Sequence, residues 1–229
     1  MKSLARIAAI ILVLAVSMGL SACSAIKLGY STLPELAYWW LDGYIDFSDE
    51  QAPQARRELE RMHDWHRRRE LPKLVEILGR MEQMAPGEVT PQQACEVVAQ
   101  VQARIAATAD HGATGAAAIS ATLTPRQLRH LDRKYRSRNE DFAKEWIERP
   151  PAELHEKRYE QALDRLETIY GRLDAAQRVL LRQAIERSIY DPARILAERQ
   201  RWQQDLLQAL RQASAPDAAA AAGAAAAAA

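Results

Sequence analysis

The sequence predicts an all-α protein, an elongated antiparallel bundle of about six to seven helices. Strong helix formers dominate the composition, and the 229 residues include only nine glycines and two phenylalanines. The sequence lacks segments typical of strands, in which Val, Ile, Thr or Tyr alternate with polar residues between turn signals. A recurring helix-start signal then sets the boundaries of the predicted helices.

The start signal is an apolar residue followed by Ser, Thr or Asp and, three positions after that cap residue, by Gln. The side-chain oxygen of the cap residue is expected to accept a bond from the backbone N–H three residues on. The Gln side chain is expected to accept a bond from the N–H of the cap residue itself, which completes a capping box. Pro91 and Pro125 occupy first helical positions, where no hydrogen bond is lost. The four pairs are Ser48 with Gln51, Thr90 with Gln93, Thr124 with Gln127, and Asp174 with Gln177.

The predicted helices follow from these starts and from Pro and Gly stops. A short helix covers 34–44, and a long helix covers 48–84, in which Pro72 should cause a kink or break near Glu70. A third helix covers 90–109, after which the glycines of segment 111–115 predict a flexible connection. The remaining predicted helices cover 124–148, 152–170, 174–190 and 192–212.

The first 22 residues predict a secretory signal peptide. Lys2 and Arg6 precede an apolar run over 7–20, and small residues then lead to Cys23. This run is shorter than the roughly 17–25 residues of a membrane-spanning helix. The segment Leu20-Ser21-Ala22-Cys23 resembles the lipobox of bacterial lipoproteins. That resemblance implies cleavage before Cys23, covalent lipid on Cys23 as the one attached group, and no other cofactor. Ser24 after the cysteine implies the periplasmic face of a Gram-negative outer membrane.

The mature chain is predicted to have three parts: a lipidated N-terminus and linker over 23–33, a helical domain over 34–212, and an alanine-rich, low-complexity tail over 213–229. Loss of Lys2 and Arg6 changes the formal charge from +1 to −1. A near-neutral chain has no global electrostatic reason to bind nucleic acid. Cys95 would be the one remaining thiol, and its apolar neighbours Val97 and Val98 predict that it is buried and inert.

Two groups of residues are candidates for a functional site. His63, His66 and Glu70 are spaced i, i+3 and i+7, which places them on one helix face, and two imidazoles with a carboxylate suit zinc. The alternative is a polar helix face on which His66 and Glu70 pair. The adjacent basic run 67–69 disfavours a cation; it could meet lipid phosphate or an acidic polymer, or it could be a solvated face.

The second group is an aromatic cluster that lies 15–21 positions after Cys23. Aromatic rings favour the headgroup level of a membrane, so this helix could rest on the bilayer beside the anchor. Alternatively it packs over the bundle. Three successive rings cannot all face one way, so the two interpretations can each hold in part. The cluster consists of Tyr38, Trp39, Trp40 and Tyr44.

Two further resemblances concern function. The segment Leu123-Thr124-Pro125-Arg126-Gln127 matches the LTxxQ motif of the Spy/CpxP group of periplasmic proteins, some of which are ATP-independent chaperones. Segments 27–30, 36–42 and 65–72 resemble a proteobacterial lipoprotein family that carries only a domain-of-unknown-function label. These segments read Lys27-Leu28-Gly29-Tyr30, Leu36-Ala37-Tyr38-Trp39-Trp40-Leu41-Asp42 and Trp65-His66-Arg67-Arg68-Arg69-Glu70-Leu71-Pro72.

The sequence contains no G-x-S-x-G, P-loop or GxGxxG motif. It therefore predicts a non-enzymatic, lipid-anchored periplasmic protein that binds envelope components. Its expected partners are the membrane, through the anchor, and envelope proteins, with no small-molecule substrate. The alternatives are a Spy/CpxP-like chaperone or envelope-stress protein, and a metal-binding helical protein.

Overall fold

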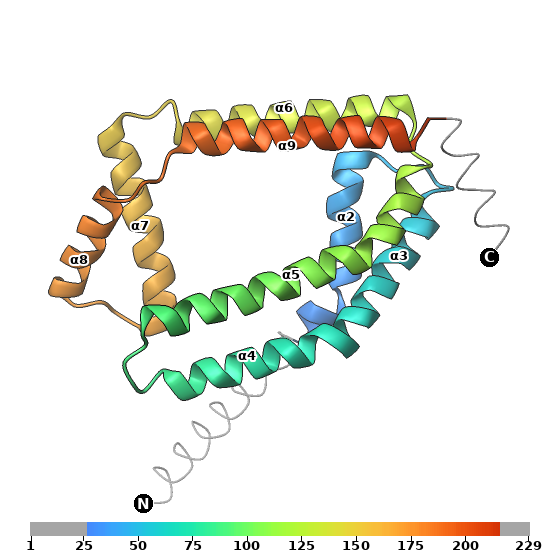
Figure 1. Ribbon diagram of the computed structural model, residues 1–229. Coiled ribbons are helices and arrows are strands. Elements are labelled where there is room, and N and C mark those ends of the chain that lie inside the picture. Colours follow the sequence, from blue (N-terminus) through green and yellow to red (C-terminus); the bar gives the residue numbers. More distant parts are fainter. Residues whose placement is uncertain (1–26, 216–229) are drawn as a thin grey trace, which may run out of the picture. The chain divides into compact units, whose positions relative to one another are not determined.

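A computed structural model describes residues 27–215, and all of the regular structure in this range is helical, which confirms the all-α prediction (Figure 1). The predicted signal peptide over 1–22, the predicted lipidation site Cys23 and residues 216–229 of the alanine-rich tail lie outside the described range. None of the helices between residues 27 and 215 is long and apolar enough to span a bilayer. The elements are α2 (Leu33–Ile45), α3 (Ala52–Trp65), the π-helical turn η1 (His66–Glu70), α4 (Leu71–Met84), α5 (Pro91–Ser120), α6 (Pro125–Trp146), α7 (Pro151–Tyr170), α8 (Ala175–Glu186) and α9 (Pro192–Ala213).

The chain divides into two compact units, and the predicted helical domain over 34–212 contains parts of both. The first unit extends to Gln127 and includes α2, α3, η1, α4, α5 and the first residues of α6. The second unit, Leu128–Gln212, includes the rest of α6 together with α7, α8 and nearly all of α9. Residues 27–31, which the sequence assigned to a linker, are helical.

In the first unit, one long helix pairs with three successive elements. Helix α5 runs antiparallel along α3, η1 and α4 (Figure 1). Near its C-terminal end, the His111 ring stacks on Trp65 of α3 with 4.0 Å between ring centroids. About two helical turns earlier on α5, the Arg104 guanidinium lies 3.2 Å from the carboxylate of Glu70 in η1. The long helix therefore holds the interrupted α3–η1–α4 segment along its length.

Helix α2 packs antiparallel on α3 through an aromatic and ionic contact. The buried Tyr38 ring stacks on Phe47 at a centroid distance of 5.9 Å. The Arg56 guanidinium lies 3.7 Å from the centroid of the Tyr38 ring and also pairs with Glu35. A cation over an aromatic face contributes about 0.5–1 kcal/mol at an exposed site and more when desolvated.

The second unit contains two antiparallel helix pairs. Between α6 and α9, the buried side-chain amides of Asn139 and Gln203 are hydrogen-bonded at 2.7 Å, and the Arg199 guanidinium lies 5.8 Å from the Phe142 ring. Between α7 and α8, the Arg178 guanidinium donates to Glu167 at 2.7 Å. Gly171 ends α7 with a φ of +77°, a conformation that glycine adopts without strain.

The predicted flexible connection over 111–115 is wrong, because α5 continues without a break to Ser120. Gly112 and Gly115 lie where α5 packs on α3. A Cβ atom at Gly112 would lie 3.6 Å from Cε of Met62, and one at Gly115 only 2.7 Å from the Glu58 carboxylate. The glycines therefore fit a close helix–helix contact, a tertiary reason that outweighs their low helix propensity.

The predicted interruption at Pro72 is present as a π-helical turn. Proline has no N–H, so it cannot donate to the carbonyl of Arg68, and its ring crowds that carbonyl. The backbone widens over His66–Glu70, and the N–H of Leu71 donates to the carbonyl of His66, five residues back. The predicted 48–84 helix is therefore divided into α3, η1 and α4. This division gives two α-helices where the sequence predicted one.

Candidate functional site

Helix α2 presents apolar side chains on two different faces. Its inner face buries Tyr38 against α3, as described above. Its outer face exposes Leu33, Leu36, Trp39 and Trp40, with 71% of Trp39 and 63% of Trp40 accessible. We call these four residues the α2 apolar face. Both sequence interpretations of the aromatic cluster thus hold in part, since Tyr38 packs in the core while Trp39 and Trp40 face outward.

The ends of α2 follow from its local sequence. Pro34 lies in the first helical positions, and Glu35 places a carboxylate in the first turn, near the positive end of the helix dipole. The helix ends at Ile45, and the next residue, Asp46, caps it: its φ of 60° is in the left-handed region and its N–H donates to the carbonyl of Asp42. Tyr44, the last member of the aromatic cluster, is half-buried and lies 4.8 Å from the Trp40 ring.

The four predicted capping pairs all form the reciprocal hydrogen bonds. In each pair, the cap N–H donates to the Gln side-chain oxygen at 2.9–3.0 Å, and the Gln N–H donates back to the cap oxygen at 2.8–3.4 Å. These bonds are present for Ser48 with Gln51, Thr90 with Gln93, Thr124 with Gln127, and Asp174 with Gln177. For Ser48, the first helical bond is from Ala52 to the Ser48 carbonyl, which lies in the turn before α3.

Two of these capping glutamines also bind each other. Nε2 of Gln127 donates to Oε1 of Gln51 at 2.6 Å and to the carbonyl of Asp46 at 2.9 Å. Nε2 of Gln51 donates to the carbonyl of Thr122 at 2.7 Å. Gln127 is buried, so its amide has protein partners in place of water. The LTxxQ segment therefore joins the start of α3 to the start of α6.

The predicted metal triad is not assembled. Nδ1 of His66 lies 2.9 Å from the hydroxyl of Tyr30, and the Tyr30 ring lies 4.6 Å from the ring of His63. Glu70 is instead bound by two cations: Lys73 at 2.6 Å and Arg104 at 3.2 Å. Within residues 27–215, no group of three His, Cys, Asp or Glu side chains is placed to hold a metal ion. The expected pairing of His66 with Glu70 is also absent from the described contacts.

Burial and nearby charges shift the pKa values of two groups in this region, Glu70 and Tyr30. The hydrogen bond from Lys73, with the nearby charge of Arg104, holds the pKa of Glu70 below its ordinary value although burial opposes this shift. Glu70 is only 1% exposed, so these two cations replace its hydration. Burial raises the pKa of Tyr30, and the positive charge of Arg67 partly offsets that rise. Nε2 of His63 is buried and has no hydrogen-bond partner within the described residues.

Sequence reasoning missed the residues that pair across helices. Arg56 lies over the ring of Tyr38, 18 positions earlier in the sequence. Arg104 is hydrogen-bonded to Glu70, 34 positions earlier. Tyr30 reaches His66 across 36 positions. A basic side chain on a helix has many acidic and aromatic neighbours within reach, so spacing alone does not select among these pairs. The buried thiol expected at Cys95 is also wrong, because Cys95 is exposed on α5.

These features define the class of protein. It is an all-α protein whose first unit carries an exposed apolar helix face and capping boxes linked through their glutamines. Residues 43–219 match a family of unknown function, DUF6279, and the chain belongs to that family. The expected domain-of-unknown-function label is thereby confirmed. Neither the curated proteins nor the solved structures provided a match.

Proposed function

We propose that this protein is a lipid-anchored helical protein on the periplasmic face of a Gram-negative outer membrane. In this proposal it is not an enzyme, and it binds other components of the envelope. The α2 apolar face carries the proposal, because it lies on the helix that begins ten residues after the lipobox cysteine, Cys23.

The length of the chain between Cys23 and α2 supports contact with lipid. Lys27, the first described residue, follows Cys23 by four positions, which span at most about 14 Å. Acyl chains on Cys23 would hold this end of the chain near the headgroups. Tryptophan rings favour that region, and burial of a large apolar side chain contributes about 1.5–3 kcal/mol. The acyl chains would provide attachment, while Trp39 and Trp40 would orient the first unit.

Cell fractionation tests the anchor. We expect the wild-type protein in the outer-membrane fraction and the Cys23→Ser variant in the soluble periplasmic fraction. Cys95→Ser is the matched control, since it removes the other thiol, and it should fractionate like the wild type. A Cys23→Ser variant that remains equally membrane-bound would contradict the proposal.

Tryptophan quenching tests the α2 apolar face separately. The lipidated protein is reconstituted into vesicles that contain lipids brominated near the headgroup. We expect quenching that falls when both Trp39 and Trp40 are changed to Gln. Trp202 of α9 is similarly exposed, at 62%, so Trp202→Gln is the matched control and should leave the quenching nearly unchanged. Equal quenching in the double variant and the wild type would rule out contact between α2 and lipid.

Binding of envelope proteins is supported by apolar side chains outside α2. Val75 and Leu78 of α4 are exposed, as are Val98 and Ile105 of α5. Scattered surface apolar residues are common, so the test has to be a direct one. In-cell crosslinking and purification of the lipidated protein should yield a defined envelope partner, and a Val98→Gln/Ile105→Gln variant should lose it. Recovery of no specific partner would leave only the membrane as a ligand.

A chaperone function is the second candidate. The LTxxQ resemblance motivates it, and the exposed apolar residues of α4 and α5 provide surface for an unfolded chain. The capping and amide bonds of Thr124 and Gln127 give the motif a structural role in this protein. The full chain in detergent should then suppress aggregation of several unrelated clients without ATP. Absence of protection for all clients would exclude this candidate.

A further inference from the structure

We propose that α3 and η1 carry a binding site for a phosphate group, formed by Arg61, Arg68 and Arg69 around Trp65. The site is separate from the α2 apolar face, and it depends on neither the lipid anchor nor the envelope location. The phosphate could belong to a phospholipid headgroup or to a soluble phosphorylated compound, because both offer the same oxygens to a guanidinium group.

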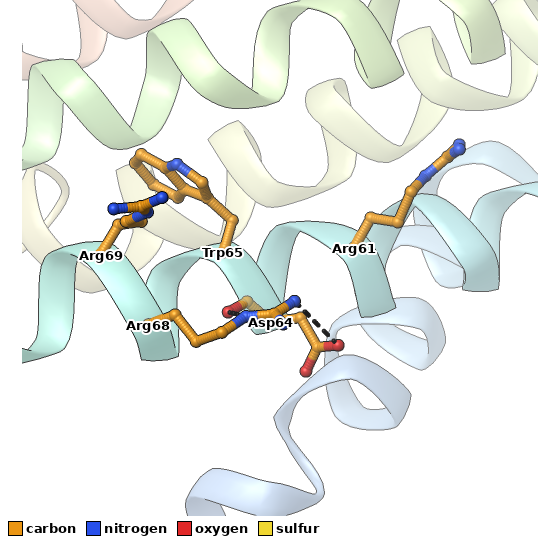
Figure 2. A pocket seen from close by; sticks show the side chains of 5 residues that line it. All are labelled: Arg61, Asp64, Trp65, Arg68 and Arg69. Atoms are coloured by element: carbon orange, nitrogen blue, oxygen red, sulfur yellow. Dashed lines mark hydrogen bonds and ion pairs between the residues drawn. The ribbon is translucent and has the colours of Figure 1, made fainter.

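These side chains surround a common hollow. A pocket of about 430 Å³ is lined by Arg61, Asp64, Trp65, Arg68 and Arg69. Positions 61, 65 and 69 are spaced i, i+4 and i+8, which keeps them near one side of a helix. Figure 2 shows Arg61, Trp65 and Arg69 rising on the same side of the helix, while Asp64 and Arg68 lie together on its other flank.

The Trp65 indole, which lines the pocket, is held in place by a contact with α5. The Trp65 ring stacks nearly parallel on His111 of α5, with 4.0 Å between centroids and 10° between planes. Two elements therefore position it. Arg68 and Arg69 lie in the π-helical turn, whose wider backbone follows from Pro72. π-Helical turns are frequent at functional sites, where they redirect side chains relative to a regular helix.

The charges of the lining favour an anion. The pocket has three guanidinium groups and one carboxylate, Asp64, which also pairs with Arg67 at 3.1 Å and with Arg68 at 3.5 Å. Arg61 pairs with Glu58 on its own helix. Within residues 27–215, the side chain of Arg69 has neither an ion pair nor a hydrogen bond, and it is exposed, so its donors are free for a ligand. Exposed pairs such as Arg68–Asp64 are weak enough to exchange for one.

Phosphate suits this arrangement better than a cation or an apolar ligand. A guanidinium group presents planar, paired donors that match phosphate oxygens, and such charge-assisted bonds are about twice as strong as neutral ones. A phosphate between Arg61 and Arg69 would lie against the Trp65 edge and away from the Asp64 flank. Asp64 holds Arg68 on that flank by an ion pair, so removal of the Asp64 charge should free Arg68 for the phosphate and strengthen binding.

Arginine modification locates the site and its source of phosphate. The full lipidated protein in nonionic detergent is treated with phenylglyoxal, and modification of each arginine is measured by mass spectrometry. One arm adds inorganic pyrophosphate. The other replaces detergent by phosphatidylcholine vesicles with or without phosphatidylglycerol. We expect at least one arm to protect Arg61 and Arg69 selectively, while Arg165, exposed on α7 in the second unit, stays reactive.

The two arms identify the source. Protection by pyrophosphate assigns a soluble phosphate ligand, and protection that requires phosphatidylglycerol assigns a lipid headgroup. Absence of protection in both arms overturns the proposal. Equal protection of Arg165 also overturns it, because that result would show only non-specific attraction.

Variants then measure the contribution of individual charges in whichever arm gives protection. Arg69→Gln should weaken binding about fivefold or more, and Asp64→Asn should tighten it about threefold, consistent with the loss or gain of one exposed charge-assisted contact. Arg57→Gln is the matched control, since Arg57 is exposed on α3 one turn before Arg61 and does not line the pocket. An Arg57→Gln variant as weak as Arg69→Gln would overturn the proposed site.

Discussion

The side-chain amides of Gln51 and Gln127 are hydrogen-bonded to each other, although 76 positions separate them in the sequence. Nε2 of Gln127 lies 2.6 Å from Oε1 of Gln51. Each glutamine also completes the capping box of its own helix. One buried contact therefore couples the start of α3 to the start of α6, and its loss should be more costly than the loss of an ordinary cap.

Gln127→Ala should lower the free energy of unfolding by about 2–3 kcal/mol. The change leaves the N–H of Thr124 without its partner and removes the bonds to Gln51 and Asp46 in a buried position. Gln177→Ala is the matched control, because Gln177 fills the same motif position but is exposed, and it should cost about 0.5–1 kcal/mol. Urea unfolding followed by circular dichroism measures both, and equal losses would contradict the coupling.

The capping boxes were predictable from sequence because each joins two residues only three positions apart. The cap and its glutamine are brought together by the first helical turn itself, and no distant contact is needed. The pairing of Gln51 with Gln127 was not predictable, because the partner of an amide is set by how the helices pack. The same limit applies to Glu70: its predicted local partner was His66, whereas the fold supplies Lys73 and Arg104.

Glycine was the main source of error in the helix boundaries. Gly112 and Gly115 have low helix propensity, which locally favours a connection. In the structure they face α3, where small residues let the two helices approach. Pro72 was interpreted correctly because its effect is local: the missing N–H and the crowded carbonyl act within one turn.

Glycine-to-alanine changes test this explanation. Gly112→Ala should raise the free energy of unfolding by about 0.5–1 kcal/mol, since alanine favours the helix and the new methyl would make only an ordinary contact with Met62. Gly115→Ala should gain less or nothing, because its methyl would displace the Glu58 carboxylate from Arg61.

Gly79→Ala in α4 is the reference for helix propensity alone, because a Cβ there meets nothing within 4 Å. Urea unfolding compares the three variants within one unit. If 111–115 were a flexible connection, Gly112→Ala would give no gain while Gly79→Ala would, and that result would contradict the continuous α5 helix.

Glu70 should make stability depend on pH in the acid range. Its pKa in the folded state is lowered, chiefly by the Lys73 hydrogen bond, from an ordinary value of 4.5. A lowered folded pKa contributes stability that is present above the unfolded value and is lost as pH falls through the folded value. The Tm difference between wild type and Glu70→Gln should therefore be largest near neutral pH and shrink as pH falls below about 4.5.

Glu76→Gln provides the control for this measurement. Glu76 is exposed on α4 and has no ion pair among residues 27–215, so its replacement should change Tm little both near neutral pH and in acid. A Glu70→Gln difference that stays constant between pH 7 and pH 3 would show that Glu70 acts through its shape and not through its charge.

Cys95 should react with a thiol reagent in the folded protein. It is exposed on α5, in contrast to the burial that its apolar neighbours predicted. A maleimide added under native conditions should therefore label Cys95 as fast as it labels the urea-unfolded chain, since reactivity follows exposure when access is not limiting.

The proposed lipid on Cys23 adds a second expectation, a single labelled site per mature chain. Cys95→Ser should then show no labelling. Labelling that requires urea would contradict the exposed position of Cys95, whereas two labelled sites would contradict lipidation of Cys23.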